Sequence, residues 1–178
     1  MENKINHSKN IILNYGVILG LILIAINVTS YATGIMLKGE QWPNYIYYII
    51  FPVFIILGIK KFKTLNSGEL LLAQGLKTGM GIAAISALVY VIYHLLFTYV
   101  IDPTFIDKMV ELTETKLIEA GMDDAQIEQT LTITRKMSNP LVGSGFWILL
   151  SAFFGFVYSL IASVIMKGEK PYKELDEL

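Results

Sequence analysis

The sequence predicts an all-α membrane protein with four transmembrane helices and an extracytoplasmic helical hairpin between spans three and four. Of its 178 residues, 54% are hydrophobic and only 16% are charged, whereas soluble domains carry about 25% charged residues. The charged residues divide the chain into four uncharged runs, and a helix needs about 20 apolar residues to cross a bilayer core. Helix is the expected form because backbone amides find no water in lipid, and four segments are too few for a closed barrel.

The four uncharged runs contain 28, 19, 24 and 30 residues. They predict a four-helix bundle within one integral membrane domain, residues 1–178, with spans at about 11–37, 42–59, 78–101 and 142–166. The first run follows two lysines and could instead be a cleaved signal peptide. It is longer than the roughly 7–15 apolar residues of such a segment, so we expect it to be retained as the first span.

The distribution of lysine and arginine predicts the orientation. With the N-terminus inside, segments 1–9, 60–77 and 167–178 carry nine cations, and the outer segments 38–40 and 102–136 carry five. Cytoplasmic loops are richer in Lys and Arg. We therefore expect both termini in the cytoplasm of a bacterial cell, a cytoplasmic tail after the last span, and a location in the inner membrane.

The segment between spans two and three contains a turn signal, Asn66-Ser67-Gly68. The leucines that follow, from Leu70 to Leu72, leave two structures open. The segment forms either a short helix on the inner membrane surface or a helical extension of span three.

The segment between spans three and four predicts the outer helical hairpin, over residues 103–137. Ser, Thr, Asp and Asn favour the position before a helix, and proline favours its first residue. The expected caps of the two hairpin helices and of span four are Asp102, Pro103, Asp123, Asn139 and Pro140. The apolar faces of the hairpin helices must bury against each other or against the outer ends of the spans.

Small residues at four-residue spacing predict how the spans pack. Helices in lipid associate where small residues let their backbones approach. The expected packing positions are Gly16 and Gly20 in span one, Gly75, Gly79, Ala83 and Ala87 in span three, and Ser151, Gly155, Ser159 and Ser163 in span four. We expect spans three and four to pack closely along these two stripes.

Two polar side chains, Asn27 in span one and His94 in span three, fall at a similar depth and on the same faces as the small residues. One interpretation is an interhelical hydrogen bond that fixes the register of the helices. The other is a buried contact to a ligand or an ion. Ser86, Tyr90 and Tyr93 lie close enough in the sequence to take part in either.

Several functions are disfavoured by what the sequence lacks. No Asp, Glu, Lys or Arg lies within a predicted span, although buried carboxylates are the usual proton relays and cation sites of membrane proteins. The chain has no cysteine, which excludes disulfides and thiol chemistry, and its net charge of −1 argues against a nucleic-acid partner. We predict no catalytic residue, cofactor or metal site, and we expect that the protein is not an enzyme.

The acidic residues of the outer segment, such as Asp107, Glu111 and Glu114, lack the spacing of a calcium loop. We expect them to form a solvated face. A weak surface for divalent cations or a cationic partner is the alternative.

Four sequence features together resemble a known family. They are Gly58-Ile59-Lys60-Lys61-Phe62 after span two, Ala73-Gln74-Gly75 before span three, Tyr99-Val100-Ile101-Asp102-Pro103-Thr104-Phe105 after it, and Asn139-Pro140 before a glycine-dotted last span. Over roughly residues 7–168 the chain resembles the uncharacterised small bacterial membrane proteins grouped as domain of unknown function 4199. The resemblance implies four spans with an outer helical insertion, and it implies no catalytic residue.

Two functions remain open from the sequence. The first is a non-catalytic scaffold or partner subunit, embedded in the lipid bilayer, whose outer hairpin contacts a membrane or envelope protein. The second is a small transporter, channel, or lipid- or small-molecule-binding protein that uses the polar level of Asn27 and His94. A polar cavity at that level favours the second function, and a fully packed interior counts against it.

Overall fold

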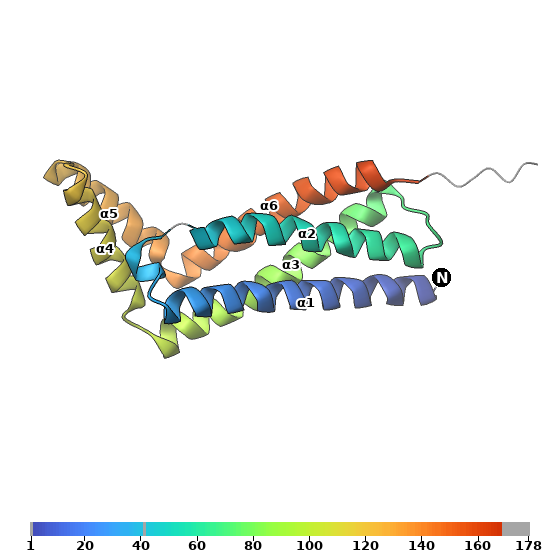
Figure 1. The fold of residues 1–178 in the computed structure, drawn as a ribbon, viewed down its shortest axis with the longest axis horizontal. Coiled ribbons are helices and arrows are strands. Elements are labelled where there is room, and N and C mark those ends of the chain that lie inside the picture. The colour runs from blue at the N-terminus through green and yellow to red at the C-terminus, as the bar shows by residue number, and fades with distance from the viewer. Residues whose placement is uncertain (1, 41, 169–178) are drawn as a thin grey trace, which may run out of the picture.

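The computed structural model describes residues 2–40 and 42–168, and these form an all-helical chain (Figure 1). The four long helices are α1 (Glu2–Ala32), α2 (Trp42–Leu65), α3 (Leu72–Leu96) and α6 (Pro140–Met166). Shorter elements are η1 (Met36–Lys38), the π-helical turn η2 (Phe97–Ile101), α4 (Phe105–Glu119) and α5 (Asp124–Ser138). Four stretches are long and apolar enough to cross a membrane: Ser8–Ala32, Tyr45–Leu65, Leu72–Ile101 and Pro140–Met166.

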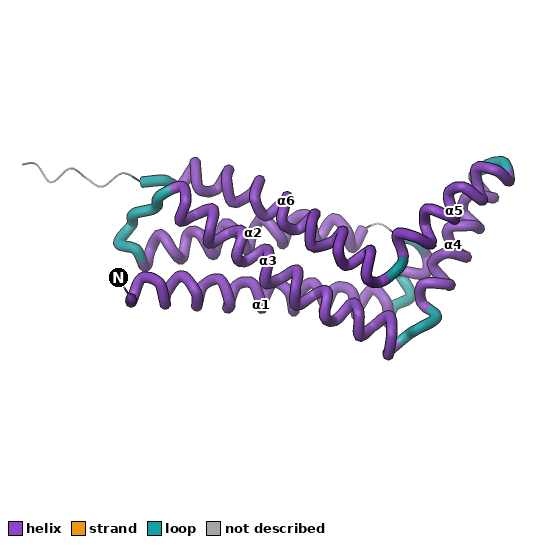
Figure 2. The backbone as a smooth tube through the Cα atoms, turned by 180° about the vertical axis from the view of Figure 1, so that it is seen from behind, coloured by secondary structure: helices purple, strands orange, loops and turns teal. Residues whose placement is uncertain are grey.

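The four long helices lie side by side, and the pair α4–α5 projects from one end of them at an angle (Figures 1 and 2). We call the end from which α4 and α5 project the hairpin end. The opposite end, where α1 begins and α6 stops, is called the terminal end. The loop from α2 to α3 lies at the terminal end, where Leu70 forms an isolated antiparallel bridge with Gly168. Lys63 donates to the last helical carbonyl oxygen, that of Met166, over 2.8 Å.

Helix α3 is the central element, because it contacts α1, α2 and α6. Its side toward α6 carries small residues, and a Cβ added at Gly75 or Gly79 would meet Ser163 or Ser159 respectively. Gly16 and Gly20 of α1 abut Ile85 and Val89 of α3 in the same way. Such positions let helix backbones approach closely, and the core residues Leu19, Ile55 and Ile82 are fully buried around them.

The helix boundaries differ from the sequence-based ones at several ends. Helix α1 stops at Ala32 rather than near residue 37, since Gly34 and Gly39 adopt φ values of +70° and +67°, a left-handed conformation that glycine adopts without strain. Helix α2 continues to Leu65, beyond the expected end at residue 59. Helix α3 begins at Leu72, so the helix of span three starts before residue 78, whereas Leu70 and Leu71 precede it in extended backbone. The described residues form no separate surface helix in this segment.

The hairpin consists of two 15-residue helices, α4 and α5, that contact each other. Asp123 is the N-cap of α5 and accepts a hydrogen bond from the Gln126 amide over 2.8 Å. Asn139 is the N-cap of α6, its side chain accepts from two backbone amides, and Pro140 is the first helical residue. Helix α4 begins at Phe105, with Thr104 before it, two residues later than the start expected at Pro103. The Asp102 side chain accepts a hydrogen bond from the Thr104 amide at 3.2 Å.

Candidate functional site

The polar level predicted near the hairpin end contains an amide bonded to two tyrosines. The Asn27 Nδ2 donates to Tyr90 Oη over 3.1 Å, and Tyr93 Oη donates to Asn27 Oδ1 over 3.0 Å. Both tyrosines lie on α3, so these bonds join α1 to α3. Asn27 thus makes interhelical hydrogen bonds to Tyr90 and Tyr93, two of the residues that the sequence named as participants, and its amide oxygen and nitrogen are both engaged by them.

Tyr90 links this amide to the aromatic side chains around it. Its ring lies parallel to that of His94, one turn along α3, with centroids 6.3 Å apart and planes at 6°. Trp147 of α6 packs against the same ring at 5.1 Å and against Tyr47 of α2 at 6.3 Å. The Tyr90 ring therefore separates Asn27 from the space that His94 faces.

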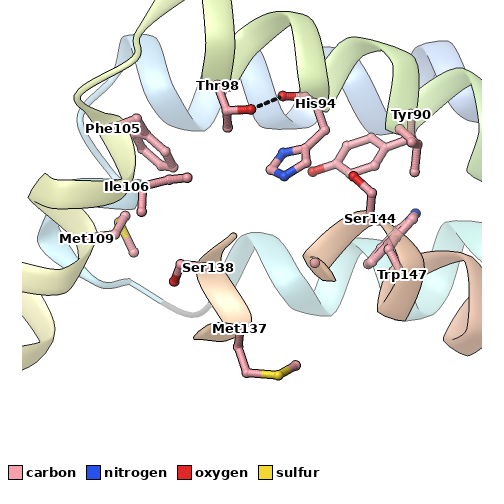
Figure 3. Close-up of a pocket in the computed structure, with 12 residues that line it drawn as sticks. Tyr90, His94, Thr98, Phe105, Ile106, Met109, Met137, Ser138, Ser144 and Trp147 are labelled. Carbon is pink, nitrogen blue, oxygen red and sulfur yellow. Dashed lines mark hydrogen bonds between the residues drawn. The ribbon is translucent and has the colours of Figure 1, made fainter. Parts of the chain in front are cut away.

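A cavity of about 310 Å³ lies where α3, α6 and the hairpin meet. Its walls are shown in Figure 3 and comprise Tyr90, Val91, His94, Thr98, Phe105, Ile106, Met109, Met137, Ser138, Gly143, Ser144 and Trp147. No Asp, Glu, Lys or Arg is among these described lining residues. The cavity is thus mainly apolar, with a few polar groups that converge from α3 and α6, which is the usual composition of a small-molecule site.

Ser144 is the most informative polar group of this cavity. It is 5% exposed, and its Oγ has no hydrogen-bond partner among the described residues. Figure 3 shows its side chain extending from α6 toward the Tyr90 and His94 rings of α3. A buried hydroxyl without a partner costs about 1–3 kcal/mol, so its place in a cavity wall calls for an acceptor or donor from a bound molecule.

Two other buried polar atoms also lack a partner within the described chain, Ser163 Oγ and Trp147 Nε1. Ser163 packs directly against Gly75 at the α3–α6 contact, so its position is explained by helix packing. Trp147, in contrast, lines the cavity together with Ser144. The two unpartnered groups near the hairpin end therefore belong to one site.

A second hollow, of about 330 Å³, lies under η1 on the other side of the aromatic cluster. Asn27, Glu40 and Tyr47 contribute to its wall, and it shares Tyr90, Met109 and Trp147 with the first cavity. Glu40 gives this hollow a carboxylate, which distinguishes it from the uncharged cavity around Ser144.

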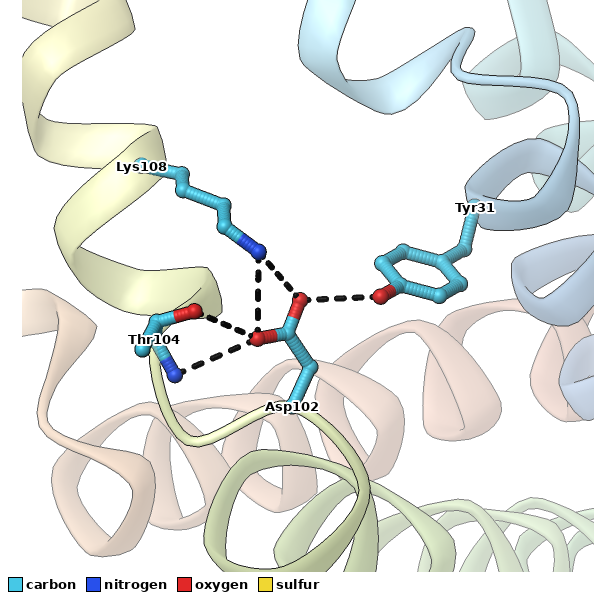
Figure 4. A network of polar contacts seen from close by, with 4 residues as sticks. All are labelled: Tyr31, Asp102, Thr104 and Lys108. Atoms are coloured by element: carbon cyan, nitrogen blue, oxygen red, sulfur yellow. Dashed lines mark hydrogen bonds and ion pairs between the residues drawn. The ribbon is translucent and has the colours of Figure 1, made fainter.

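Asp102 ties the base of the hairpin to the long helices (Figure 4). Its carboxylate is 7% exposed and accepts hydrogen bonds from Thr104 N and Oγ1, from Lys108 Nζ at 2.9 Å and 3.2 Å, and from Tyr31 Oη at 2.9 Å. The bonds from Thr104, and after them those from Lys108, lower the pKa of Asp102 to about 2. The same pairing raises the pKa of Lys108, so both groups stay charged at neutral pH.

The sequence-predicted residues fall into separate places. Asn27 and His94 lie near the cavity and on opposite sides of Tyr90, whereas the small-residue stripes form helix contacts rather than a site. No group of three potential metal-ligating residues occurs within the described ranges 2–40 and 42–168. Sequence reasoning missed Ser144 and Trp147, although they lie seven and four residues before Ser151 and so continue the face of its stripe.

Comparison with protein-family models finds a match over residues 14–168, to the family described as protein of unknown function (DUF4199). No curated protein and no solved structure matches the chain. The matched segment runs from α1 to the end of α6, so it includes both the cavity and the hairpin. Since it covers most of the chain, the resemblance seen in the sequence is confirmed, and the protein belongs to the DUF4199 family.

Proposed function

We propose that the protein is a non-enzymatic membrane protein that binds a small, largely apolar molecule in the cavity between α3, α6 and the hairpin. The observation that carries this proposal is the Ser144 hydroxyl, which is buried in the cavity wall without a partner among the described residues. A buried polar group of this kind is normally hydrogen-bonded. A bound molecule with an oxygen or nitrogen atom at that place satisfies it.

The cavity wall also indicates the chemistry of the bound molecule. Ser144 donates or accepts, and the Trp147 indole nitrogen only donates. Most of the remaining wall is apolar, with Val91, Phe105 and Met109 among its members. These groups favour a molecule with an apolar body and at least one oxygen acceptor, either uncharged or weakly anionic.

The test is retention of a small molecule by the purified protein. Native mass spectrometry of the chain taken from its membrane with a mild detergent is expected to show an adduct. Ser144→Ala is expected to reduce the adduct, because it removes the hydroxyl from the cavity. Ser159→Ala is the matched control, since Ser159 lies on the same helix and its hydroxyl bonds to the Gly155 carbonyl of its own helix. Absence of any adduct, or equal loss in both variants, contradicts the proposal.

We also propose that the hairpin end faces away from the cytoplasm and that the protein resides in a bacterial inner membrane. The terminal end carries seven lysines of the described chain, Lys4, Lys9, Lys60, Lys61, Lys63, Lys77 and Lys167, which supports a cytoplasmic position for that end. Because the chain has no cysteine, Glu119→Cys and Ser67→Cys place single thiols at exposed positions of the two ends. A membrane-impermeant maleimide applied to intact cells is expected to label only the first, and the reverse pattern inverts the orientation.

A second candidate function, a scaffold that contacts a protein partner through the hairpin, is supported by apolar side chains exposed on it. Ile118, Met122 and Ile133 are 60%, 38% and 56% exposed. Mild cross-linking in native membranes, followed by affinity purification and mass spectrometry, is expected to recover a stoichiometric protein joined through residues 105–138. Recovery of the chain alone removes this candidate.

A further inference from the structure

One face of α6 runs from the cavity toward the middle of the long helices. Ser144, Trp147, Ser151, Phe154 and Tyr158 follow one another at spacings of three and four residues, so they lie on the same side of the helix. At 1.5 Å per residue, this face is about 21 Å long. It begins in the cavity beneath the hairpin and continues into a separate groove.

The groove lies between α2 and α6 and has a volume of about 160 Å³. Its walls are almost entirely apolar or aromatic, with Tyr48 and Phe51 on α2, Leu150 and Phe154 on α6, and Leu23 of α1 behind them. Tyr48 and Phe154 remain 63% and 39% exposed. Because both helices are long and apolar enough to cross a membrane, these exposed aromatic edges meet lipid chains when the protein is embedded in a bilayer.

Trp147 connects the groove to the cavity, because its side chain lines both. Its Nε1 is buried and has no partner in the described chain. In Figure 3 the nitrogen-bearing end of the indole points away from His94, whereas Ser144 points toward the His94 and Tyr90 rings. Two buried polar groups without a partner in the described chain thus lie three residues apart on α6, and Trp147, one of the two residues, lines both hollows.

The depth of Trp147 also matters. It lies seven residues, or about 10 Å, after the first residue of α6, close to the hairpin end of a candidate span. Tryptophan is enriched at the membrane interface, where its ring contacts chains and its N–H meets polar groups. At this depth the indole N–H is shielded from water and needs another hydrogen-bond acceptor. A lipid carries such acceptors in its ester groups, between its polar group and its acyl chains.

We propose that the molecule bound by this protein is a membrane lipid that spans both hollows. Its acceptor-bearing polar group lies at Ser144 in the cavity, an ester carbonyl oxygen accepts from Trp147 Nε1–H, and one acyl chain fills the groove between α2 and α6. The proposal rests on the proposed function and adds the class of the bound molecule. No acidic side chain among the described residues lines either hollow, so a phosphoryl group meets no carboxylate there.

The test uses the two tryptophans of the chain, Trp42 and Trp147. In a Trp42→Phe background, Trp147 is the sole indole, and phosphatidylcholine with brominated acyl chains quenches its fluorescence on contact. We expect quenching of the delipidated protein in detergent to saturate at equimolar lipid. Quenching that rises in proportion to bulk lipid, without saturation, overturns the proposal.

Matched variants of two neighbouring leucines locate the acyl chain of the bound lipid. Leu150→Phe narrows the groove and is expected to raise the half-saturating lipid concentration about tenfold or more, since a hydrophobic site discriminates by this much for a small change in size. Leu149→Phe is the control, because Leu149 is the adjacent residue, is 66% exposed and does not line the groove. Tyr48→Ser, at the exposed rim, gives a second variant that weakens binding without disturbing the core. Equal behaviour of the Leu149 and Leu150 variants overturns the proposal.

The Ser144→Ala variant separates this inference from the proposed function. One outcome is that a retained adduct depends on Ser144 while Trp147 shows no saturable quenching. This outcome overturns the proposal that the bound molecule is a lipid and leaves the proposed function standing. If quenching is saturable and Ser144→Ala leaves it unchanged, the polar group of the lipid does not lie at Ser144, and that part of the proposal is overturned. Quenching that both Leu150→Phe and Ser144→Ala weaken supports the complete proposal.

Discussion

The contact between α3 and α6 differs between its two halves. Toward the terminal end the two helices touch through small residues, with Gly75 against Ser163 and Ala83 against Gly155. Continued in the same register toward the hairpin end, the stripe passes Ala87 and Ser151 and reaches Val91 and Trp147, both of which line the cavity. The same pair of helices is therefore tightly packed in one half and separated in the other.

The difference teaches that side-chain size along one helix face determines where this protein has space. A stripe of small residues lets the backbones approach, and a tryptophan that follows it holds them apart. The separated half also contains the buried Ser144 hydroxyl, which lines this space, whereas Ser163 of the packed half lies directly against Gly75. Four substitutions test this contrast, from the largest expected effect to the smallest.

Gly155→Leu is expected to disrupt the packed half. A Cβ at Gly155 would lie 2.5 Å from Ala83 Cβ, so the two backbones must separate, at a cost of about 3 kcal/mol. Thermal melting in detergent measures the loss. Gly145→Leu is the control on the same helix, because a Cβ there has open space around it. An unchanged melting temperature for Gly155→Leu contradicts the small-residue contact.

Asn27→Leu is expected to weaken the link between α1 and α3 at the hairpin end. The variant removes two hydrogen bonds, to Tyr90 and Tyr93, and polar contacts between apolar helices are worth roughly 0.6–2 kcal/mol. Asn14→Leu serves as control, since Asn14 is on the same helix and exposed. If both variants melt alike, the amide contributes nothing to the register of the two helices.

Ser159→Ala and Ser144→Ala are expected to differ in stability when no molecule is bound. Ser159 donates to the Gly155 carbonyl, so its loss costs about 1 kcal/mol. Ser144 has no partner in the described chain, so its replacement removes an unsatisfied buried hydroxyl and is expected to raise the free energy of unfolding, by about 1–3 kcal/mol. Denaturation in detergent compares the two. A large loss for Ser144→Ala identifies it as a structural residue and contradicts its role in binding.

The attachment of the hairpin is expected to be insensitive to pH above about 4. The carboxyl of Asp102 has a usual pKa of 3.8 and a pKa of about 2 in the folded protein. Because the pKa is lower in the folded state, the ionised carboxylate stabilises the fold at pH values above 3.8. This contribution is lost as the pH falls from 3.8 through 2. Spin labels on Leu37→Cys and Glu119→Cys report the distance between the loop and the hairpin. A change in distance between pH 8 and pH 5 contradicts this expectation.

The sequence predicted features that depend on nearby residues, and it missed those that depend on distant ones. Four long helices followed from uncharged runs, and the packing of Gly79 against Ser159 followed from regular spacing in both helices. The sequence left the partner of Asn27 open among several residues, because the rotation of α1 and the long reach of Tyr90 and Tyr93 decide it. Asp102 was predicted as a helix cap from its local sequence, whereas Tyr31, 71 residues earlier, and Lys108 determine its position.

The cavity itself could not be predicted, since it arises from the meeting of three elements. Ser144, Trp147 and Val91 are unremarkable in an apolar helix when read one at a time. Only the register of α3 and α6 places them opposite one another, and only the angle of the hairpin brings Phe105 and Met109 over them.

The contacts of the hairpin with the chain before it have a consequence for how the protein is made. Besides Asp102 and Tyr31, Lys116 of α4 donates to the Gly39 carbonyl over 3.3 Å. Both acceptor regions are translated before α4, and domains fold from the N-terminus during synthesis. When the hairpin is synthesised, the residues that it contacts around Tyr31 and Gly39 have therefore already been made. Helix α6 is translated after α3 and the hairpin, so the cavity acquires its α6 wall only after its other walls have been made.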